Sequence, residues 1–252
     1  MLNIASKTIG YDIVATDGEL GTVSDFLFDD ASWKVRWLVV DTGNWLPGRK
    51  VLLPPMVLGH PNPDEKQFPV RMTKQQVKDS PDIDTERPVS RQMEADVYEY
   101  YGWSPYWGTG FYMGGYMPGY GFIEGARMQP AASEAPGRAQ QITAARQEDG
   151  DPHLRSIKAV MGHHINATDG EIGHVEDFLM NDTDWNIHYL VVDTKNWWPG
   201  KKVLISPRSA QEIDWNEKLV HLDVTRHQVK ESTPYDASKP LGRTYERRHA
   251  AE

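Results

Sequence analysis

The sequence repeats itself at a constant spacing of 152 residues. This offset places Thr16-Asp17-Gly18-Glu19 on Thr168-Asp169-Gly170-Glu171, and Asp41-Thr42 on Asp193-Thr194. About 34 of the 71 positions from Gly10 to Ser80 are identical to the residue 152 positions further on, without a gap. A period of this length is typical of a duplicated domain, because solenoid repeats are only roughly 20–45 residues long. The chain must therefore build one fold twice.

Each copy has the pattern of short β-strands followed by one short helix. In the first copy the β-branched and aromatic runs predict strands at residues 13–15, 21–28, 35–40, 50–53 and 66–71. Asp17-Gly18 is typical of the two central residues of a type I′ hairpin turn. Thr73 with Gln76, and Thr225 with Gln228, have the spacing of a capping box and predict the helices. We expect each copy to close into its own small β-barrel, because closure removes exposed strand edges.

The composition changes sharply between the two copies. Residues 98–122 contain 11 of the 26 aromatic residues, interleaved with glycine and without a helical or strand period. We therefore predict a first barrel domain over residues 1–92, a Tyr/Trp/Gly-rich linker over 93–152, a second barrel domain over 153–242 and a polar tail over 243–252.

A known family has the same motifs. Thr-Asp-Gly-Glu-x-Gly-x-Val, followed by Trp-Leu-Val-Val-Asp-Thr in the first copy, resembles the PRC-barrel family, which is named for the cytoplasmic domain of the photosynthetic reaction centre H subunit. The resemblance covers residues 6–88 and 158–240. It implies a mainly β fold of two tandem small barrels with five or six strands each, no shared catalytic site, and action through protein–protein contact. Modules of this kind pair in many proteins, so we expect the two barrels to pair within the chain or a homodimer to form.

Composition and motifs exclude several functional classes. A formal charge of −9, without a clustered basic face, argues against nucleic-acid binding. The absence of cysteine excludes thiol chemistry and thiolate-bound metals. The sequence has no apolar run of transmembrane length and no secretory leader pattern, which favours a bacterial cytoplasmic protein. No nucleophile-elbow, Walker or zinc-protease motif is present, so we expect neither a cofactor nor an enzyme.

Acidic and histidine residues are the candidates for catalytic or metal-binding groups. The acidic residues shared by the copies are Asp17, Glu19, Asp25 and Asp41 with their counterparts Asp169, Glu171, Asp177 and Asp193. Paired carboxylates could support a hydrolase, whereas turns and strand ends also select aspartate, and Asp41 is placed to bind the amides of the loop that follows it. Eight of the nine histidines lie in the second half, including His163-His164. Neighbours on a strand point to opposite faces, so His163 and His164 would not share one metal ion. The first copy has other residues at the equivalent positions, so we expect surface variation and no metal site.

The loop after the 35–40 strand carries the best candidates for partner binding. The candidates are Trp45, Leu46 and Arg49, their counterparts Trp197, Trp198 and Lys201, and the linker residues Trp103, Trp107 and Tyr112. Trp and Arg often dominate the binding energy of interfaces, although Trp45 could equally cap one end of a barrel. The preferred interpretation is a non-catalytic adaptor or scaffold that binds another protein. The alternative is a peripheral accessory of a membrane or photosynthetic complex at the inner membrane, because Tyr and Trp favour membrane interfaces.

Overall fold

The computed structural model describes residues 1–47, 49–79, 153–194, 198, 201–232 and 234–236. Residues Met1–Thr85 and His153–Glu252 belong to one compact unit. We call residues 1–79 the first repeat and residues 153–236 the second repeat. Trp103, Trp107, Tyr112 and Trp197 lie outside the described residues.

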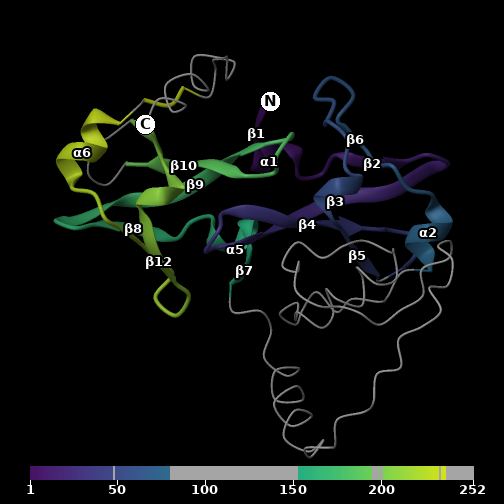
Figure 1. The fold of residues 1–252 in the computed structure, drawn as a ribbon, viewed down its shortest axis with the longest axis horizontal. Coiled ribbons are helices and arrows are strands. Elements are labelled where there is room, and N and C mark those ends of the chain that lie inside the picture. The colour runs from purple at the N-terminus through teal and green to yellow at the C-terminus, as the bar shows by residue number, and fades with distance from the viewer. Residues whose placement is uncertain (48, 80–152, 195–197, 199–200, 233, 237–252) are drawn as a thin grey trace, which may run out of the picture. The chain divides into compact units, whose positions relative to one another are not determined.

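The two repeats contain the same elements in the same order (Figure 1). The first repeat consists of β1 (Leu2–Ile4), α1 (Ala5–Thr8), β2 (Asp12–Ala15), β3 (Gly18–Asp29), β4 (Lys34–Asp41), β5 (Lys50–Leu53), a 3-10 turn η1 (Pro55–Val57), β6 (Gln67–Pro69) and α2 (Lys74–Lys78). The second consists of β7 (Leu154–Ser156), α5 (Ile157–Val160), β8 (His164–Ala167), β9 (Gly170–Asn181), β10 (Ile187–Asp193), β11 (Lys202–Ile205), η2 (Pro207–Ser209), β12 (Ala210–Asp214), β13 (Leu219–Leu222) and α6 (Arg226–Glu231). Among the elements of the described residues, β12 is the one exception without a counterpart, because Gly59, Pro61 and Pro63 leave isolated bridges at the equivalent place.

Each repeat forms one twisted sheet that stays open. The strand order is β5-β4-β3-β2-β6 in the first repeat and β11-β10-β9-β8-β13-β12 in the second. In the described part of the chain, no ladder joins β5 to β6 or β11 to β12. The prediction of closed barrels is therefore wrong, while the mainly β fold with a short terminal helix is confirmed. The edge strands are too short to close the sheet, because prolines 54, 55 and 207 end β5 and β11 after four residues.

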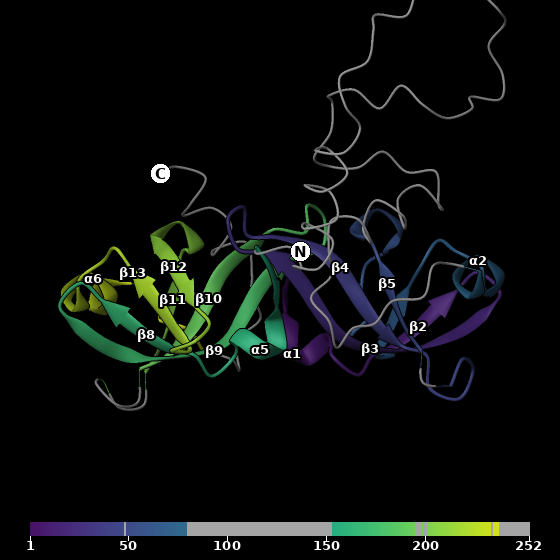
Figure 2. The ribbon, with the colours of Figure 1, turned by 90° about the horizontal axis from the view of Figure 1, so that it is seen from below.

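The first strand of each repeat belongs to the sheet of the other repeat. β1 pairs antiparallel with β9, where Leu2 faces Asn181 and Ile4 faces Leu179. β7 pairs in the same way with β3, where Leu154 faces Asp29. The helices follow their strands, so that α1 contacts β9 and α5 contacts β3 at the junction of the repeats (Figure 2). We call residues 1–9 and 153–161 the exchanged segments.

Aromatic side chains from both repeats form one shared core. The ring of Phe26 stacks on Trp185 at 6.4 Å between centroids, and Phe68 stacks on the same indole at 5.9 Å. The ring centroids of Phe28 and Phe178 are 5.7 Å apart. The backbone continues this contact, because Val35 N donates to Trp185 O and Ile187 N donates to Trp33 O, both at 2.8 Å. The expectation of two self-contained cores is therefore wrong, since each repeat buries its rings partly against the other.

The first hairpin forms where the sequence predicts it, but with a different turn. Ala15 pairs with Gly18, so Thr16 and Asp17 are the loop residues, and only Gly18 has a positive φ, of 138°. The type I′ assignment is therefore wrong. Asp17 instead accepts a hydrogen bond from Lys74 N at 2.7 Å, and its carboxylate joins the hairpin to the start of α2.

The capping boxes are confirmed in both repeats. Thr73 accepts from Gln76 N, and the Gln76 side chain accepts from Thr73 N at 2.9 Å. Thr225 and Gln228 make the same pair of bonds at the start of α6. These local signals are read correctly from the sequence because both partners lie within one helical turn.

Candidate functional site

One buried threonine lies at the start of the loop between β4 and β5, and one at the start of the loop between β10 and β11. Thr42 Oγ1 lies within hydrogen-bond distance of the carbonyl oxygens of Leu46, at 2.8 Å, and Arg49, at 2.6 Å, so that its one proton can be donated to either. Thr194 Oγ1 contacts the carbonyl groups of Trp198 at 2.9 Å and Lys201 at 2.8 Å. In both repeats a single hydroxyl thus contacts the two carbonyl groups that lie four and seven residues further along the chain. We call these loops the Trp loops. No sequence motif identifies Thr42 and Thr194 as the residues that make these contacts.

The indoles of the Trp loops are held between core and solvent. Trp45 and Leu46 are half-buried, and Trp198 is half-buried at the position equivalent to Leu46. The ammonium group of Lys74, on α2, lies over the Trp45 ring at 4.9 Å from its centroid. A cation over an indole face is an attractive contact that also keeps the ring oriented.

The basic candidates connect the Trp loop to the terminal helix. Arg49 Nη1 donates to the Lys78 carbonyl at the end of α2 at 2.7 Å. Its counterpart Lys201 is exposed. The structure therefore brings Trp45, Leu46 and Arg49 together beside α2.

Four basic positions around each loop are shared by the repeats. In the first repeat they are Arg49, Lys50, Lys74 and Lys78, and in the second they are Lys201, Lys202, Arg226 and Lys230. Lys202 also pairs with the carboxylate of Glu176. Four basic positions are thus shared by the repeats, as are the acidic residues Asp41 and Asp193 at the start of the loops, in a chain whose formal charge is −9.

Two of the acidic candidates lie at the junction of the repeats, where Asp177 is buried and Asp25 is half-buried. Asp25 Oδ1 accepts from Phe26 N at 2.8 Å and from Lys158 N at 3.2 Å, and Oδ2 accepts from the Ser156 hydroxyl. Burial raises the pKa of the Asp25 carboxyl above its usual value, and these hydrogen bonds, led by that of Ser156, oppose the rise. Each carboxylate oxygen is thus engaged in holding the start of α5.

Asp177 plays the equivalent part for α1. Its Oδ1 accepts from Phe178 N at 2.8 Å and Ser6 N at 3.1 Å, while Oδ2 accepts from the Ser6 hydroxyl. Burial raises the pKa of the Asp177 carboxyl, against the effect of the bonds from Ser6 and Phe178. The geometry of both carboxylates supports a structural role at the exchanged segments.

Asp41, Asp169 and Glu171 make contacts within their own repeat. Asp41 Oδ1 accepts from Gly43 N at 2.9 Å, as the sequence predicts. Asp169 accepts from Arg226 N at 2.7 Å and repeats the link that Asp17 makes to α2. Glu171 Oε1 lies 2.9 Å from His164 Nδ1.

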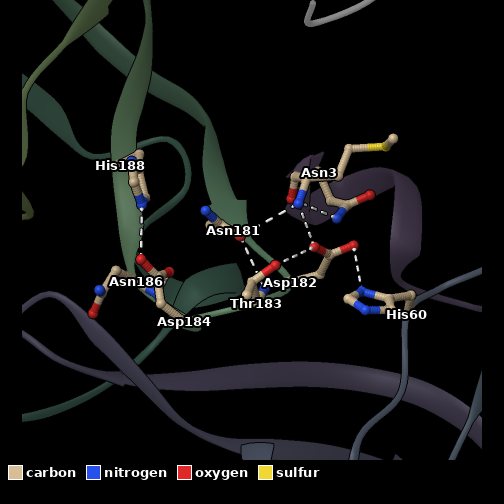
Figure 3. A network of polar contacts seen from close by, with 9 residues as sticks. Asn3, His60, Asn181, Asp182, Thr183, Asp184, Asn186 and His188 are labelled. Carbon is tan, nitrogen blue, oxygen red and sulfur yellow. Dashed lines mark hydrogen bonds and ion pairs between the residues drawn. The ribbon is translucent and has the colours of Figure 1, made fainter. Parts of the chain in front are cut away.

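Two further carboxylates, one in each repeat, anchor the ends of the exchanged strands β1 and β7. Asp182 lies in a polar network in which its side chain contacts the Met1 ammonium group at 2.5 Å and His60 Nδ1 at 3.2 Å (Figure 3). Burial alone would raise the pKa of Asp182, but the hydrogen bonds from the ammonium group, Asn3 and His60 hold it below its usual value.

Its equivalent in the first repeat is Asp30. The Asp30 carboxylate contacts Arg155 Nε at 2.5 Å and His153 Nδ1 at 2.8 Å. No local sequence pattern marks Asp30 or Asp182, because the partners of both lie far away along the chain.

One histidine departs from the expectation of surface variation. His163 is only 2% exposed and meets the Trp215 ring edge-on at 5.4 Å between centroids. Burial, together with the charges of Lys218 and His164, lowers the pKa of His163. Within the described ranges no group of three or more His, Cys, Asp or Glu residues could hold a metal ion. No helix in that part of the chain is long and apolar enough to span a membrane.

Comparison with known proteins gives one finding that bears on function. The family model of the PRC-barrel domain matches residues 3–74 of the sequence, which confirms the resemblance for the first repeat. No curated protein matches the chain.

Proposed function

We propose, from the premise that residues 3–74 form a PRC-barrel domain, that this protein is a non-catalytic adaptor that binds another protein through its Trp loops. The domain is of a protein-interaction type that is generally non-catalytic. The observation that supports the proposal is a contact shared by the described residues of both loops, in which the buried Thr42 or Thr194 hydroxyl meets the carbonyl groups four and seven residues further on.

The charges around the loops indicate the kind of partner. Basic residues occupy the same four sequence positions in both repeats, and in the first repeat one of them, Lys74, lies over the Trp45 indole. Aromatic and basic groups on a fixed loop are suited to a protein surface that offers apolar and carboxylate groups. We therefore infer an acidic protein partner, bound at two equivalent places on one chain.

Affinity capture with the full chain tests this proposal. The bait is compared with a Trp45→Ala/Trp198→Ala variant in an extract of the cells that make the protein. Met56→Ala is the matched control, because Met56 is an apolar side chain, 45% exposed, outside both loops. We expect the double variant to lose proteins that the control retains, and the retained proteins to be released by salt. Equal capture by all three baits would overturn the adaptor proposal.

A second candidate is a peripheral accessory of a membrane complex at the cytoplasmic face of the inner membrane. The observation that favours it is the density of Tyr and Trp in residues 98–122. Co-sedimentation with lipid vesicles, lost on deletion of residues 98–122, is the expected result if the linker binds a membrane. Protein that stays in the supernatant with vesicles of every charge would count against it.

A further inference from the structure

His163 occupies a buried position that the fold fills with a different residue in the first repeat. It lies between α5 and β8 and is 2% exposed. Its backbone is fixed, because His163 N donates to Val160 O at 3.0 Å and Val175 N donates to His163 O at 2.9 Å. Tyr11 has the equivalent position and makes the equivalent two backbone bonds. The fold therefore does not require an imidazole at this place.

The ring of His163 is connected to the junction of the repeats through one indole. Trp215, in the turn between β12 and β13, meets the His163 ring edge-on at 5.4 Å between centroids. The Arg155 guanidinium, on the exchanged strand β7, lies over the same indole at 4.8 Å from its centroid. Arg155 Nε donates to Asp30 Oδ2, in the first repeat, at 2.5 Å. Trp215 thus lies between the buried imidazole and the cation that holds β7 to the other repeat.

The surroundings of the His163 ring suit a neutral imidazole. Its Nε2 atom is buried and has no hydrogen-bond partner among the described residues, and the same is true of Trp215 Nε1. An imidazolium carries a proton on both ring nitrogens, so a proton on Nε2 would be buried without a protein acceptor. The ring therefore gains a charge only at a cost that the folded structure does not offset.

The charges around His163 also oppose its protonation. In the described part of the chain, the charges that act on the ring are those of Lys218, at the β12–β13 turn, and His164, the next residue on β8, and with burial they lower the pKa of His163. An imidazolium would also be a second cation at the indole that Arg155 already covers. On β9 the acidic neighbour of Val175, Glu176, is paired with Lys202, and on α5 the charged residue Lys158 is exposed.

We propose that His163 makes the attachment of β7 to the first repeat sensitive to acid. Protonation of the imidazole breaks its edge-on contact with Trp215, and the indole then no longer supports the Arg155 guanidinium. Arg155 leaves Asp30 more readily, and β7 detaches from β3 more often. This acid response belongs to the junction of the repeats and does not depend on a partner at the Trp loops.

The response should appear as the pH falls below the ordinary pKa of histidine. A histidine whose folded pKa lies below the unfolded value of 6.5 contributes stability that is fully present above 6.5 and is lost as the pH falls through the folded pKa. Two other groups at the same strand act in the opposite direction. His153 is charged beside Asp30 only when it is protonated, and burial raises the pKa of Asp25, which holds the start of α5. The test therefore compares variants that keep both groups.

Amide hydrogen exchange of the full chain, followed residue by residue, measures the attachment of β7. Protection is the exchange rate relative to that of an unfolded chain at the same pH, and it reports local opening. Between about pH 7.5 and about pH 5.5, either side of 6.5, we expect protection of residues 154–156 to fall by about tenfold for each unit by which the pKa of His163 is lowered. Residues 2–4, on β1, should keep theirs, because Tyr11 and Pro63 replace His163 and Trp215 in the first repeat.

Two variants, each of which introduces the residue of the first repeat, separate His163 from the other histidines. His163→Tyr introduces the residue found at Tyr11, and protection of residues 154–156 should then show no fall over this pH range. His227→Gln introduces the residue found at Gln75 and is the matched control, because the His227 side chain is 80% exposed. It should retain the fall of the unmodified protein.

A fall of the same size in His163→Tyr and in the unmodified protein would overturn the proposal. If His163→Tyr does not fold, the unmodified chain decides by itself. Unchanged protection of residues 154–156 between the two pH values, or an equal loss at residues 2–4, would then show that His163 does not control β7.

Discussion

At the scale of the residue, buried aspartates join the two repeats. Asp25 and Asp177 each accept a backbone amide of the opposite repeat, and both carboxyls have a pKa raised by burial. Removing a carboxylate from water costs free energy, and the hydrogen bonds that Asp25 and Asp177 accept offset part of this cost. The junction should therefore respond to pH.

The direction of that response follows from the raised pKa. A carboxyl with a folded pKa above the value of 3.8 in the unfolded chain contributes stability that is fully present below 3.8 and is lost as the pH rises through the folded pKa. The Asp25→Asn/Asp177→Asn variant cannot ionise at these sites. We expect its free energy of unfolding to increase relative to the unmodified protein as the pH rises across this window.

Chemical denaturation at a series of pH values above and below 3.8 checks this expectation. Asp64→Asn is the matched control, because Asp64 is exposed. A difference between the double variant and the unmodified protein that does not change with pH would show that burial of the two carboxyls has no energetic consequence.

Gly21 gives a second prediction at the residue scale. Its φ is 140°, and a Cβ there would lie 2.0 Å from the Asp41 carbonyl oxygen. Gly10 also has a positive φ, of 85°, but a Cβ there meets open space. Gly10→Ala should lower the free energy of unfolding by about 1–2 kcal/mol from strain alone, and Gly21→Ala by more than about 3 kcal/mol. Equal losses in denaturant unfolding would contradict the close approach of β3 to β4.

Residue roles are predictable from the sequence where the partner is near in the chain. The prediction that Asp41 binds its following loop is confirmed by its bond from Gly43 N. Asp25 stands out in the sequence only as a shared acidic residue, because its partners Ser156 and Lys158 are more than a hundred positions away. Trp33 has an unexpected positive φ of 57°, in the turn that contacts the other repeat through Ile187 N.

At the scale of the element, the exchanged segments are the part of the fold that the sequence repeat does not predict. The identity between the copies is high from Gly10 onward, whereas in residues 1–9 and 153–161 only Leu2 and Leu154 match. The strands and helices after Gly10 are predictable because their periodicity and capping signals are local. β1 and β7 have three residues each, too few for a period to be visible.

The two exchanged helices should differ in their dependence on serine. The Ser6 hydroxyl donates to Asp177, so Ser6→Ala should cost about 1.5–3 kcal/mol, the usual value of a hydrogen bond to a charged group. The Ser156 hydroxyl donates to Asp25 and also accepts from Ala159 N at 3.0 Å as the N-cap of α5. Ser156→Ala should therefore cost about 1 kcal/mol more.

Denaturant unfolding of the two variants provides the comparison. Thr183→Ala serves as control, because the Thr183 hydroxyl makes a hydrogen bond of 3.5 Å at an exposed turn beside Asp182 and takes no part in either helix. If Ser6→Ala proved the more destabilising change, the additional N-cap role of Ser156 would be wrong.

At the scale of the whole molecule, the duplication lets each repeat extend the sheet of the other. The second half of β3 pairs with β7 and the second half of β9 pairs with β1, so edges that would otherwise be exposed are covered by the other repeat. The duplication is visible in the sequence, but the expectation of edge protection by barrel closure within each copy is wrong. Pairing partners that come from another part of the chain cannot be read from local propensity.

Cleavage between the repeats gives the last prediction. A protease site introduced into residues 80–152 of the full chain is cut after folding, which removes the covalent connection and leaves the exchanged strands, the carboxylate anchors and the shared aromatic core in place. Both products should stay together as one particle in size-exclusion chromatography under native conditions. Phe178→Ala removes the ring that faces Phe28 and should cost about 3–5 kcal/mol, so the same cut in this variant should release the two products more readily. Products that separate at once after cleavage of the unmodified chain would show that the repeats are independent domains held only by their linker, because repeats that share strands and a core should stay together without it.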